Sequence, residues 1–245
     1  MDRALFVLGP TGVGKSEFAI KLAKLFNGEI ISADSVQIYK HLDIGSAKIS
    51  KSQMQGIAHH CIDILQPDEE FSVFEFVELT KSLISQINKK GKLPIVVGGT
   101  GLYVKALLEG YDFGGTSRNS EFRDGLWRQE STALFEELQK IAPNLAQSIQ
   151  PNDKKKIIRA LEIAKFGSVP KSQGTNIDFL ALALTCERKG LYQKINDRVE
   201  KMLDCGLIDE VASLKKMGLN EENQSMKAIG YKEVLWFLDG KISEE

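Results

Sequence analysis

The sequence has little cysteine, no excess of either charge and no long apolar run. Its three cysteines, Cys61, Cys186 and Cys205, are far apart and odd in number, and no CxxC pair occurs among its 245 residues. This usage suggests neither a disulfide framework nor a zinc knuckle, and it is typical of a protein of the reducing cytoplasm. No apolar stretch approaches the roughly 20 residues that cross a bilayer, and the N-terminal segment does not resemble a signal peptide, so we expect no membrane partner.

The charges are balanced, with 32 Lys and Arg against 33 Asp and Glu. A nucleic-acid partner would therefore need a local basic patch, because the bulk charge does not supply one. The length allows one substantial core, or one domain with a smaller insert.

Short apolar runs alternate with helical patterns in the first part of the chain. Such alternation predicts an α/β fold, here a P-loop-type parallel sheet core with helices on both faces. Ser72 and Glu75 predict a capping box for the helix that ends at Gly91. The predicted strands are 3–8, 29–34, 58–65, 93–99 and 179–185, and the predicted helices of this part are 16–26, 72–91 and 102–110.

The pattern changes after residue 110, where most segments have helical spacing. We therefore expect a core domain of residues 1–111 and 176–245, with a mostly helical insertion domain at 112–175. The predicted helices of this part are 119–140, 144–149, 153–166, 189–204, 207–217 and 226–238.

The segment GPTGVGKS follows the first predicted strand and precedes a helix, which is the setting of a phosphate-binding loop. Its glycines let backbone N–H groups converge on an anion, and the helix N-terminus faces the same point. A lysine charge and a serine hydroxyl suited to Mg²⁺ complete a site for a polyphosphate or diphosphate ester, without identifying the reaction. The loop consists of Gly9, Pro10, Thr11, Gly12, Val13, Gly14, Lys15 and Ser16.

Two further features lie where predicted strands end. Asp34 follows the second strand and is a candidate metal ligand, a candidate general base or a simple helix cap. The segment VVGGTGLY contains a second glycine turn, in which Thr100 offers a hydroxyl and an N–H group. Its glycines either let backbone approach a ligand or only allow tight packing between strand and helix.

Several segments together resemble the bacterial tRNA dimethylallyltransferases, also called tRNA isopentenyltransferases, over nearly the whole chain. The segments DSVQIY and GGTGLY are far more specific than the phosphate-binding loop. The segments that carry the resemblance are, in order, GPTGVGKS, GEIISADSVQIYKHLDIGSAK, HHCIDILQPDEEFS, GKLPIVVGGTGLYVKALLEG, PNDKKKIIRALEI and AIGYKEVLWFLDGKIS.

The resemblance implies a reaction and its substrates. Dimethylallyl diphosphate would donate its five-carbon group to N6 of adenosine 37, next to the anticodon in the stem-loop of a tRNA, and diphosphate would leave. The phosphate-binding loop and Arg198 would hold the diphosphate, with Mg²⁺ on Ser16. The resemblance also implies a cytoplasmic enzyme, which we expect to be a monomer.

The same resemblance assigns roles to residues near the reacting atoms. Asp34 would be the catalytic base, and Thr100 would bind close to the reacting centre. The adenine must leave its stack, which is least costly in a single-stranded loop. Asp34 and Thr100, together with Ser35, Val36 and Gln37, would touch the extruded nucleotide and its neighbours.

A basic cluster begins the helix predicted at 153–166. Cations at a helix N-terminus oppose the helix dipole, so the cluster indicates either an anionic ligand or a solvated charged face. The resemblance favours tRNA contact by Lys155, Lys156 and Arg159, and it places Arg123 at a further tRNA position.

Two departures from the family pattern stand out. The phosphate-binding loop reads TGVGKS where many relatives have TASGKT, which retains a hydroxyl at the metal position. Relatives usually continue past GKIS with a basic helix that helps to hold tRNA, so we expect tRNA affinity to suffer without it.

Two other function classes share parts of these motifs. A small-molecule or nucleotide kinase would use the same loop and an Asp on the next strand, but it would form ADP rather than release diphosphate. A P-loop switch or RNA-binding module would need no catalytic base. The segments DSVQIY and GGTGLY favour the prenyltransferase over both.

Overall fold

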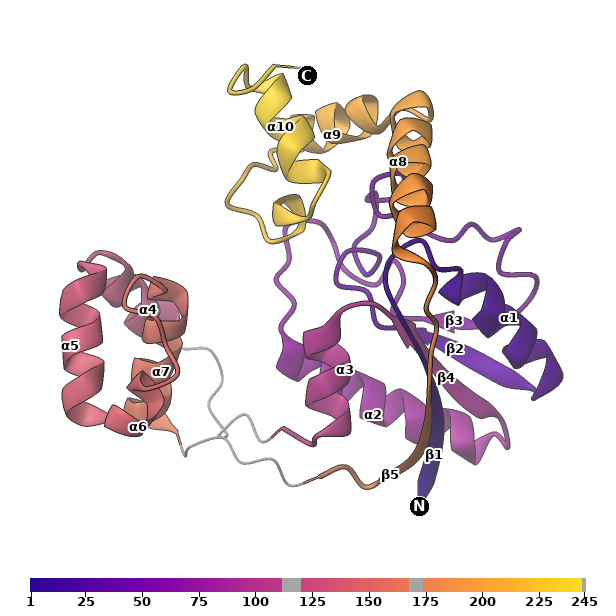
Figure 1. Cartoon of the computed structure of the whole chain (residues 1–245), viewed down its shortest axis with the longest axis horizontal. Coiled ribbons are helices and arrows are strands. Elements are labelled where there is room, and N and C mark those ends of the chain that lie inside the picture. Colours follow the sequence, from indigo (N-terminus) through magenta and orange to yellow (C-terminus); the bar gives the residue numbers. More distant parts are fainter. Residues whose placement is uncertain (112–119, 168–173, 244–245) are drawn as a thin grey trace. The chain divides into compact units, whose positions relative to one another are not determined.

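The computed structural model describes residues 1–111, 120–167 and 174–243. The chain divides into two compact units, one formed by Met1–Leu108 with Thr175–Glu245 and the other by Glu109–Gly174. The first unit contains a parallel sheet, and the described part of the second is helical (Figure 1). The predicted fold class, a parallel sheet core with helices on both faces and a mostly helical second part, is confirmed.

The described strands form one five-stranded sheet in the order β3-β2-β4-β1-β5, with every pair parallel. Apart from β2 and β3, which an irregular segment joins, neighbours in the sheet are not consecutive in the chain, and crossover connections that contain helices join them. The strands are β1 (Asp2–Leu8), β2 (Gly28–Ser32), β3 (His59–His60), β4 (Leu93–Gly98) and β5 (Ile177–Ala183).

Helices cover both faces of the sheet (Figure 1). Leu5 and Val7 of β1 pack with residues of α1 (Lys15–Leu25), while Phe6 between them points to the opposite face. That face carries α2 (Val73–Lys89) and α3 (Gly101–Leu108). Burial on both faces explains why β1 and β4 read as continuous apolar runs.

The predicted start of α2 is confirmed. The Ser72 hydroxyl accepts the N–H of Glu75, and the Glu75 carboxylate accepts the N–H of Ser72. Gly91, with a φ of 70°, follows the last turn, where a residue without a side chain is favoured.

The main differences between the predicted elements and the structure concern three of them. The strand predicted at 58–65 is limited to β3, because the backbone turns at Cys61 (φ 61°) and Asp63 (φ 55°). The helix predicted at 119–140 is two helices, α4 (Ser120–Trp127) and α5 (Ser131–Ile141), separated where Glu130 is extended. The helix predicted at 226–238 is a 3-10 turn, η1 (Ser225–Lys227), and then α10 (Tyr231–Leu238), because Gly230 has a φ of 91°.

The second unit has a core of its own. Its helices α4 and α5 are followed by α6 (Pro143–Ala146) and α7 (Lys154–Phe166). Leu134 and Leu138 of α5 pack with Ile157 and Leu161 of α7, and all four are fully or almost fully buried. The assignment of this unit to tRNA contact stays a prediction.

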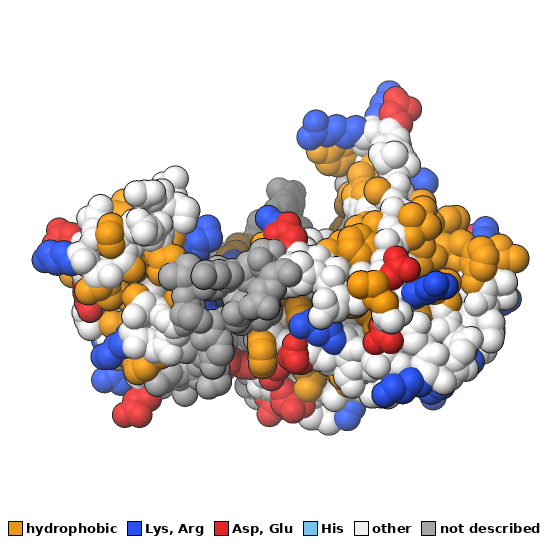
Figure 2. Space-filling model, turned by 90° about the horizontal axis from the view of Figure 1, so that it is seen from below, with side chains coloured by type: hydrophobic (Ala, Val, Ile, Leu, Met, Phe, Trp, Pro, Cys, Tyr) orange, Lys and Arg blue, Asp and Glu red, His pale blue; other side chains and the backbone are white. Residues whose placement is uncertain are grey.

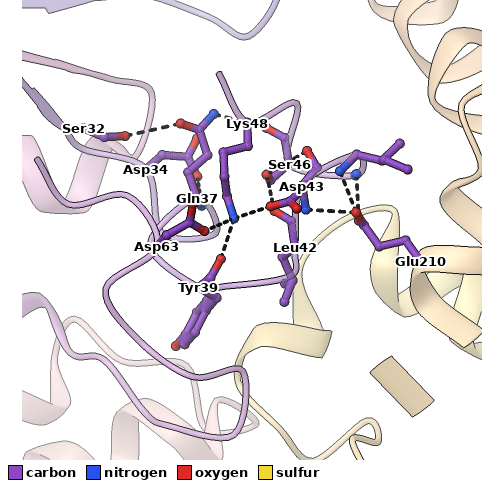
Figure 3. A network of polar contacts seen from close by, with 12 residues as sticks. Ser32, Asp34, Gln37, Tyr39, Leu42, Asp43, Ser46, Lys48, Asp63 and Glu210 are labelled. Carbon is purple, nitrogen blue, oxygen red and sulfur yellow. Dashed lines mark hydrogen bonds and ion pairs between the residues drawn. The ribbon is translucent and has the colours of Figure 1, made fainter. Parts of the chain in front are cut away.

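The long segment between β2 and β3 is held by the buried ammonium group of Lys48, whose side chain is 5% exposed. It donates to the carbonyl oxygen of Tyr39 at 2.7 Å, to Oδ1 of Asp43 at 2.6 Å and to Oδ1 of Asp63 at 2.5 Å (Figure 3). One cation thus ties two parts of this mostly irregular segment to the turn that follows β3.

Charges of both signs intersperse on the face of the molecule that Figure 2 shows, in line with the balanced composition. No helix in the described part of the chain is long and apolar enough to span a membrane.

A buried carboxylate ties β2 to its neighbours. Glu29, with a side chain 5% exposed, accepts from Lys92 at 2.9 Å and contacts Nε2 of His60 at 2.7 Å and Lys90 at 3.5 Å. Burial alone would raise the pKa of Glu29, but the hydrogen bonds from Lys92 and His60 outweigh it and lower the pKa from 4.5 to about 2.

We predict that Glu29→Gln lowers the free energy of unfolding at pH 7 by roughly 1.5–3 kcal/mol, the range for hydrogen bonds to charged groups. A depressed carboxyl pKa stabilises the fold above the unfolded value, and this contribution disappears as the pH falls from 4.5 towards 2. The difference from wild type, measured by urea unfolding, therefore shrinks over that interval. Glu78→Gln, at an exposed ion pair, is the control, and a pH-independent difference for Glu29→Gln would contradict this account.

Candidate functional site

The register of the sheet brings three strand ends to one level. Leu8 of β1 pairs with Gly98 of β4, and Ser32 of β2 pairs with Val97. The N–H of Ala33 donates to the carbonyl oxygen of Val97 at 2.7 Å, which extends this pairing by one residue. The phosphate-binding loop, Asp34 and the GGTG turn therefore all leave the sheet at its carboxyl edge.

Glycine is required at two of these strand ends. A Cβ on Gly98 would lie 2.3 Å from the carbonyl oxygen of Ala33, and a Cβ on Gly9 would lie 2.5 Å from that of Leu184. Both contacts are with backbone and are closer than the 3 Å that real Cβ atoms keep. The strand ends are thus packed at a distance that only glycine allows, so tight packing explains part of the second glycine turn.

The connections of β1 and β4 diverge to opposite faces of the sheet. The chain leaves β1 into α1 on one face and leaves β4 into α3 on the other (Figure 1). Adjacent parallel strands with divergent connections leave a crevice at their carboxyl ends, where α/β proteins bind ligands.

The phosphate-binding loop is preformed. Gly12 and Gly14 have φ values of 83° and 91°, and no side chain caps the N-terminus of α1 at Gly14. The Lys15 ammonium donates to the carbonyl oxygen of Pro10 at 2.8 Å. Burial lowers the pKa of Lys15, while the Asp34 carboxylate opposes that shift. The positive end of a helix and a partly desolvated lysine thus face one point, where a diphosphate would fit.

Backbone N–H groups of the residues that follow Asp34 hold its carboxylate at the carboxyl edge of the sheet. Its Oδ1 accepts the N–H groups of Val36 at 2.9 Å and Gln37 at 3.2 Å, so it caps a turn rather than a helix. No described residue donates to its Oδ2. The residues Ser35, Val36 and Gln37 are therefore held beside the carboxylate by the same two hydrogen bonds.

A cavity of about 890 Å³ unites most of the predicted site residues of the first unit. The strand-end turns contribute one polar side of it, and the charged group of Arg198 contributes another. Gly9, Pro10 and Val13 belong to the same loop but are not part of the lining. The predicted residues that line the cavity are Thr11, Gly12, Gly14, Lys15, Ser16, Asp34, Ser35, Val36, Gln37, Thr100 and Arg198.

The cavity also has an apolar wall, which comes largely from α8 (Arg188–Asp204). The sequence predicts that Leu191, Ile195, Val199 and Met202 face inward to a core, yet no residue of α8 is buried. Ile195, Val199 and Met202 instead line the cavity, and the helix rises where β5 ends (Figure 1). Ile30 and Ile49 add apolar surface from the sheet and the long loop.

Arg198 and Gln37 share an anchor. The Arg198 guanidinium donates to the carbonyl oxygen of Ser46 at 3.3 Å, and Nε2 of Gln37 donates to the same oxygen at 3.2 Å. Burial lowers the pKa of Arg198, and the charge of Asp34 opposes that shift. One carbonyl therefore positions two side chains of the cavity.

The predicted tRNA residues beyond the cavity belong to the second unit. Arg123 donates through Nε and Nη2 to both oxygens of Glu162, whose side chain is fully buried, and Arg159 donates to the same carboxylate at 2.6 Å. Both arginines therefore stabilise a buried charge within this unit. Lys155 and Lys156 are exposed at the start of α7, and Lys156 also pairs with Asp153.

Sequence reasoning missed several residues around the cavity. His59, Ile62 and the segment from Lys227 to Gly230 line it, and Glu210 supports its loop from α9 (Leu207–Lys216). The segment AIGYKE contributed to the family resemblance without a role being assigned to it. The prediction of a single helix over 226–238 concealed this segment, whose Ile229 is exposed in the structure.

The fold and the loop after β1 are those of a P-loop-type α/β protein, and the cavity between the loop, the carboxylate and the apolar wall is suited to a phosphorylated ligand with an apolar part. A sequence model described as IPP transferase matches residues 37–245, and the chain belongs to this family.

Relatives of known name support this assignment. A tRNA dimethylallyltransferase of Caldanaerobacter subterraneus subsp. tengcongensis is 44% identical over 98% of this chain and 81% of its own length. One of Carboxydothermus hydrogenoformans is 44% identical over 99% of this chain and 81% of its own length.

Solved structures agree. The full-length tRNA isopentenylpyrophosphate transferase of Bacillus halodurans matches with a TM-score of 0.74 and 42% identity, over all of this chain and 80% of that one. A eukaryotic dimethylallyltransferase acting on tRNA matches with a TM-score of 0.85 and 31% identity, over 98% of this chain and 64% of that one.

We predict that Gly98→Ala destabilises the protein by roughly 1–3 kcal/mol, the cost of forcing an extra methyl group into a packed site. The strand end must move away from Ala33, which also displaces the glycine turn. Gly101→Ala is the matched control, because Gly101 lies three residues beyond Gly98 and a Cβ there would meet no atom within 4 Å. Urea unfolding measures both variants, and equal stability of the two would disprove the packing argument.

Proposed function

We propose that the protein transfers a dimethylallyl group from dimethylallyl diphosphate to N6 of adenosine 37 in tRNA and releases diphosphate. The observation that carries this proposal is that Asp34, the phosphate-binding loop and an apolar wall line one cavity. The names of the relatives favour this reaction over the kinase alternative. Since the substrate is tRNA, the reaction belongs to the cytoplasm, and the monomer stays our expectation.

The diphosphate binds at the phosphate-binding loop. The N-terminus of α1 and the Lys15 ammonium face its oxygens, and Arg198 approaches from α8 on the other side of the cavity. As the bond to carbon breaks, negative charge builds on the departing diphosphate. Preorganised cations and N–H groups stabilise that charge more strongly than water does.

Magnesium fits this arrangement as a partner of the diphosphate. The Ser16 hydroxyl lines the cavity and is a hard oxygen ligand of the kind that Mg²⁺ prefers. No group of three or more His, Cys, Asp or Glu residues that could enclose a metal occurs in the described part of the chain. We therefore assign Mg²⁺ to Ser16 together with diphosphate oxygens, where it would neutralise part of their charge.

Asp34 acts as the general base. Adenine N6 attacks the allylic carbon, the carbon–oxygen bond breaks with its electron pair going to the diphosphate, and the N6 proton passes to Asp34. Oδ1 holds the turn at Val36 and Gln37, so Oδ2 is the oxygen to receive the proton. Thr100, beside the same strand ends, binds close to the reacting centre.

The apolar wall receives the five-carbon group. Ile195, Val199 and Met202 would contact its methyl groups and exclude water, which would otherwise capture a cation-like allylic carbon. This role explains why the apolar side of α8 faces a cavity rather than a core.

The adenine enters the cavity as an extruded base. Ser35, Val36 and Gln37 lie beside Asp34 and would touch the nucleotide and its neighbours. We assign the helical domain at 112–175 to tRNA contact through the exposed Lys155 and Lys156. Arg123 and Arg159 are proposed as weaker contributors, because both already pair with Glu162.

We predict that Asp34→Asn reduces kcat for prenyl transfer about 10²–10⁴-fold, the usual contribution of a general base. An asparagine oxygen still accepts from Val36 and Gln37, so the turn and tRNA binding are retained. Incubation with dimethylallyl diphosphate, Mg²⁺ and unmodified tRNA, followed by nucleoside analysis for N6-dimethylallyladenosine, measures transfer.

Three outcomes of this experiment are informative. Unchanged transfer by Asp34→Asn removes the residue from its role. Absence of the modified nucleoside with wild-type protein refutes the proposed function itself. Formation of ADP from ATP would instead favour the kinase.

A further inference from the structure

We propose that Glu210 is a positioning residue for the cavity, acting through the turn of residues 43–47, which we call the anchor turn. Its carboxylate fixes the N-terminal half of the turn, and the C-terminal half holds Arg198 and Gln37. The inference rests on the proposed function for its effect on transfer, but its effect on anion binding can be measured without transfer.

The Glu210 carboxylate accepts hydrogen bonds from three consecutive backbone N–H groups. Oε2 accepts the N–H groups of Asp43 at 3.0 Å and Ile44 at 2.8 Å, and Oε1 accepts that of Gly45 at 3.2 Å (Figure 3). The hydroxyl of Tyr231 donates to Oε1 at 2.5 Å. Four donors on one ionised acceptor make charge-assisted hydrogen bonds, which are stronger than neutral ones.

The anchor turn transmits this constraint to the cavity. The N–H of Ala47 donates to the carbonyl oxygen of Ile44, and the N–H of Lys48 to that of Asp43, both at 2.9 Å, so the two halves of the turn move together. The carbonyl oxygen of Ser46 then accepts from Arg198 and from Gln37. A shift at residues 43–45 therefore displaces the acceptor of two cavity side chains.

The anchor turn is also packed closely against the C-terminal helices α9 and α10 at Gly45. A Cβ on Gly45 would lie 2.6 Å from the ring of Tyr231 and 2.8 Å from Leu207. Tyr231 is fully buried, and burial together with the Glu210 charge raises its pKa, so the hydroxyl stays a donor. The position of the turn is thus fixed both by the hydrogen bonds to the Glu210 carboxylate and by close packing against the Tyr231 ring.

A double-mutant cycle tests the inference. Glu210→Gln replaces one acceptor oxygen by an amide that donates, so it cannot hold three N–H groups. We expect it to weaken binding of inorganic pyrophosphate, measured by calorimetry, about tenfold in the wild-type background. In the Arg198→Ala background we expect no further loss, because contacting groups couple non-additively.

The transfer reaction supplies a second readout. Glu210→Gln should raise the KM for dimethylallyl diphosphate, through Arg198, and the KM for tRNA, through Gln37, more than it lowers kcat. A purely structural role would lower the melting temperature and the active fraction without changing either KM. Additive losses in the pyrophosphate cycle would overturn the inference, whatever the melting temperature.

Two further variants complete the design. Asp209→Asn removes the same charge from an exposed neighbour on α9 and should leave pyrophosphate binding within about twofold of wild type. If Glu210→Gln fails to fold, Gly45→Ala takes its place in the cycle, because it displaces the anchor turn and leaves the carboxylate intact. Pyrophosphate binding without transfer by wild type would refute the proposed function, while the cycle would still decide on Glu210.

Discussion

The parallel pairing of β1 with β4 and of β4 with β2 is the constraint on which the site depends. Because Leu8, Gly98 and Ala33 end at one level, the residues that follow them meet at one edge without any further device. The backbone of Gly98 lies so close to the carbonyl oxygen of Ala33 that no side chain fits between the two strand ends. The phosphate-binding loop, the carboxylate and the second glycine turn therefore meet because of one register, and a slip of one residue in either pairing would misalign their strand ends and turn buried side chains to the other face.

Charge of both signs is concentrated in the cavity, although the protein as a whole is almost neutral. Lys15 and Arg198 are both partly desolvated, and the Asp34 carboxylate opposes the loss of charge of each. A bound diphosphate would neutralise the two cations and leave the carboxylate to interact with the base of the nucleic acid. The charges that line the cavity of the free protein are thus those that the two proposed substrates would need: cations for an anionic diphosphate and a carboxylate for an amine that gives up a proton.

Features that depend on residues close together in the chain could be predicted from the sequence. The strands around Phe6 and Val96, the phosphate-binding loop and the capping box at Ser72 each depend on neighbouring residues alone. The sequence could not show that Arg198 and Glu210 meet the segment at 43–47, because those contacts join residues more than 150 positions apart. The apolar side of α8 was read as a core face, since periodicity reports which side is apolar and not what covers it. The strand at 58–65 was predicted too long because a non-glycine residue such as Cys61 gives no sign in the sequence of a positive φ. The break before α10 falls at Gly230, a glycine that the helical spacing alone did not mark as a helix start.

The lack of any buried residue in α8 has a consequence for the free protein. A helix of this length normally owes its stability to packing, and segments with few buried contacts open most readily. The isoprenoid would complete the interior that the polypeptide leaves unfinished, so that the small molecule acts as a missing piece of the hydrophobic core. Binding of the substrate would then also stabilise the helix against local opening, and amide hydrogen exchange along α8 would slow as the ligand binds.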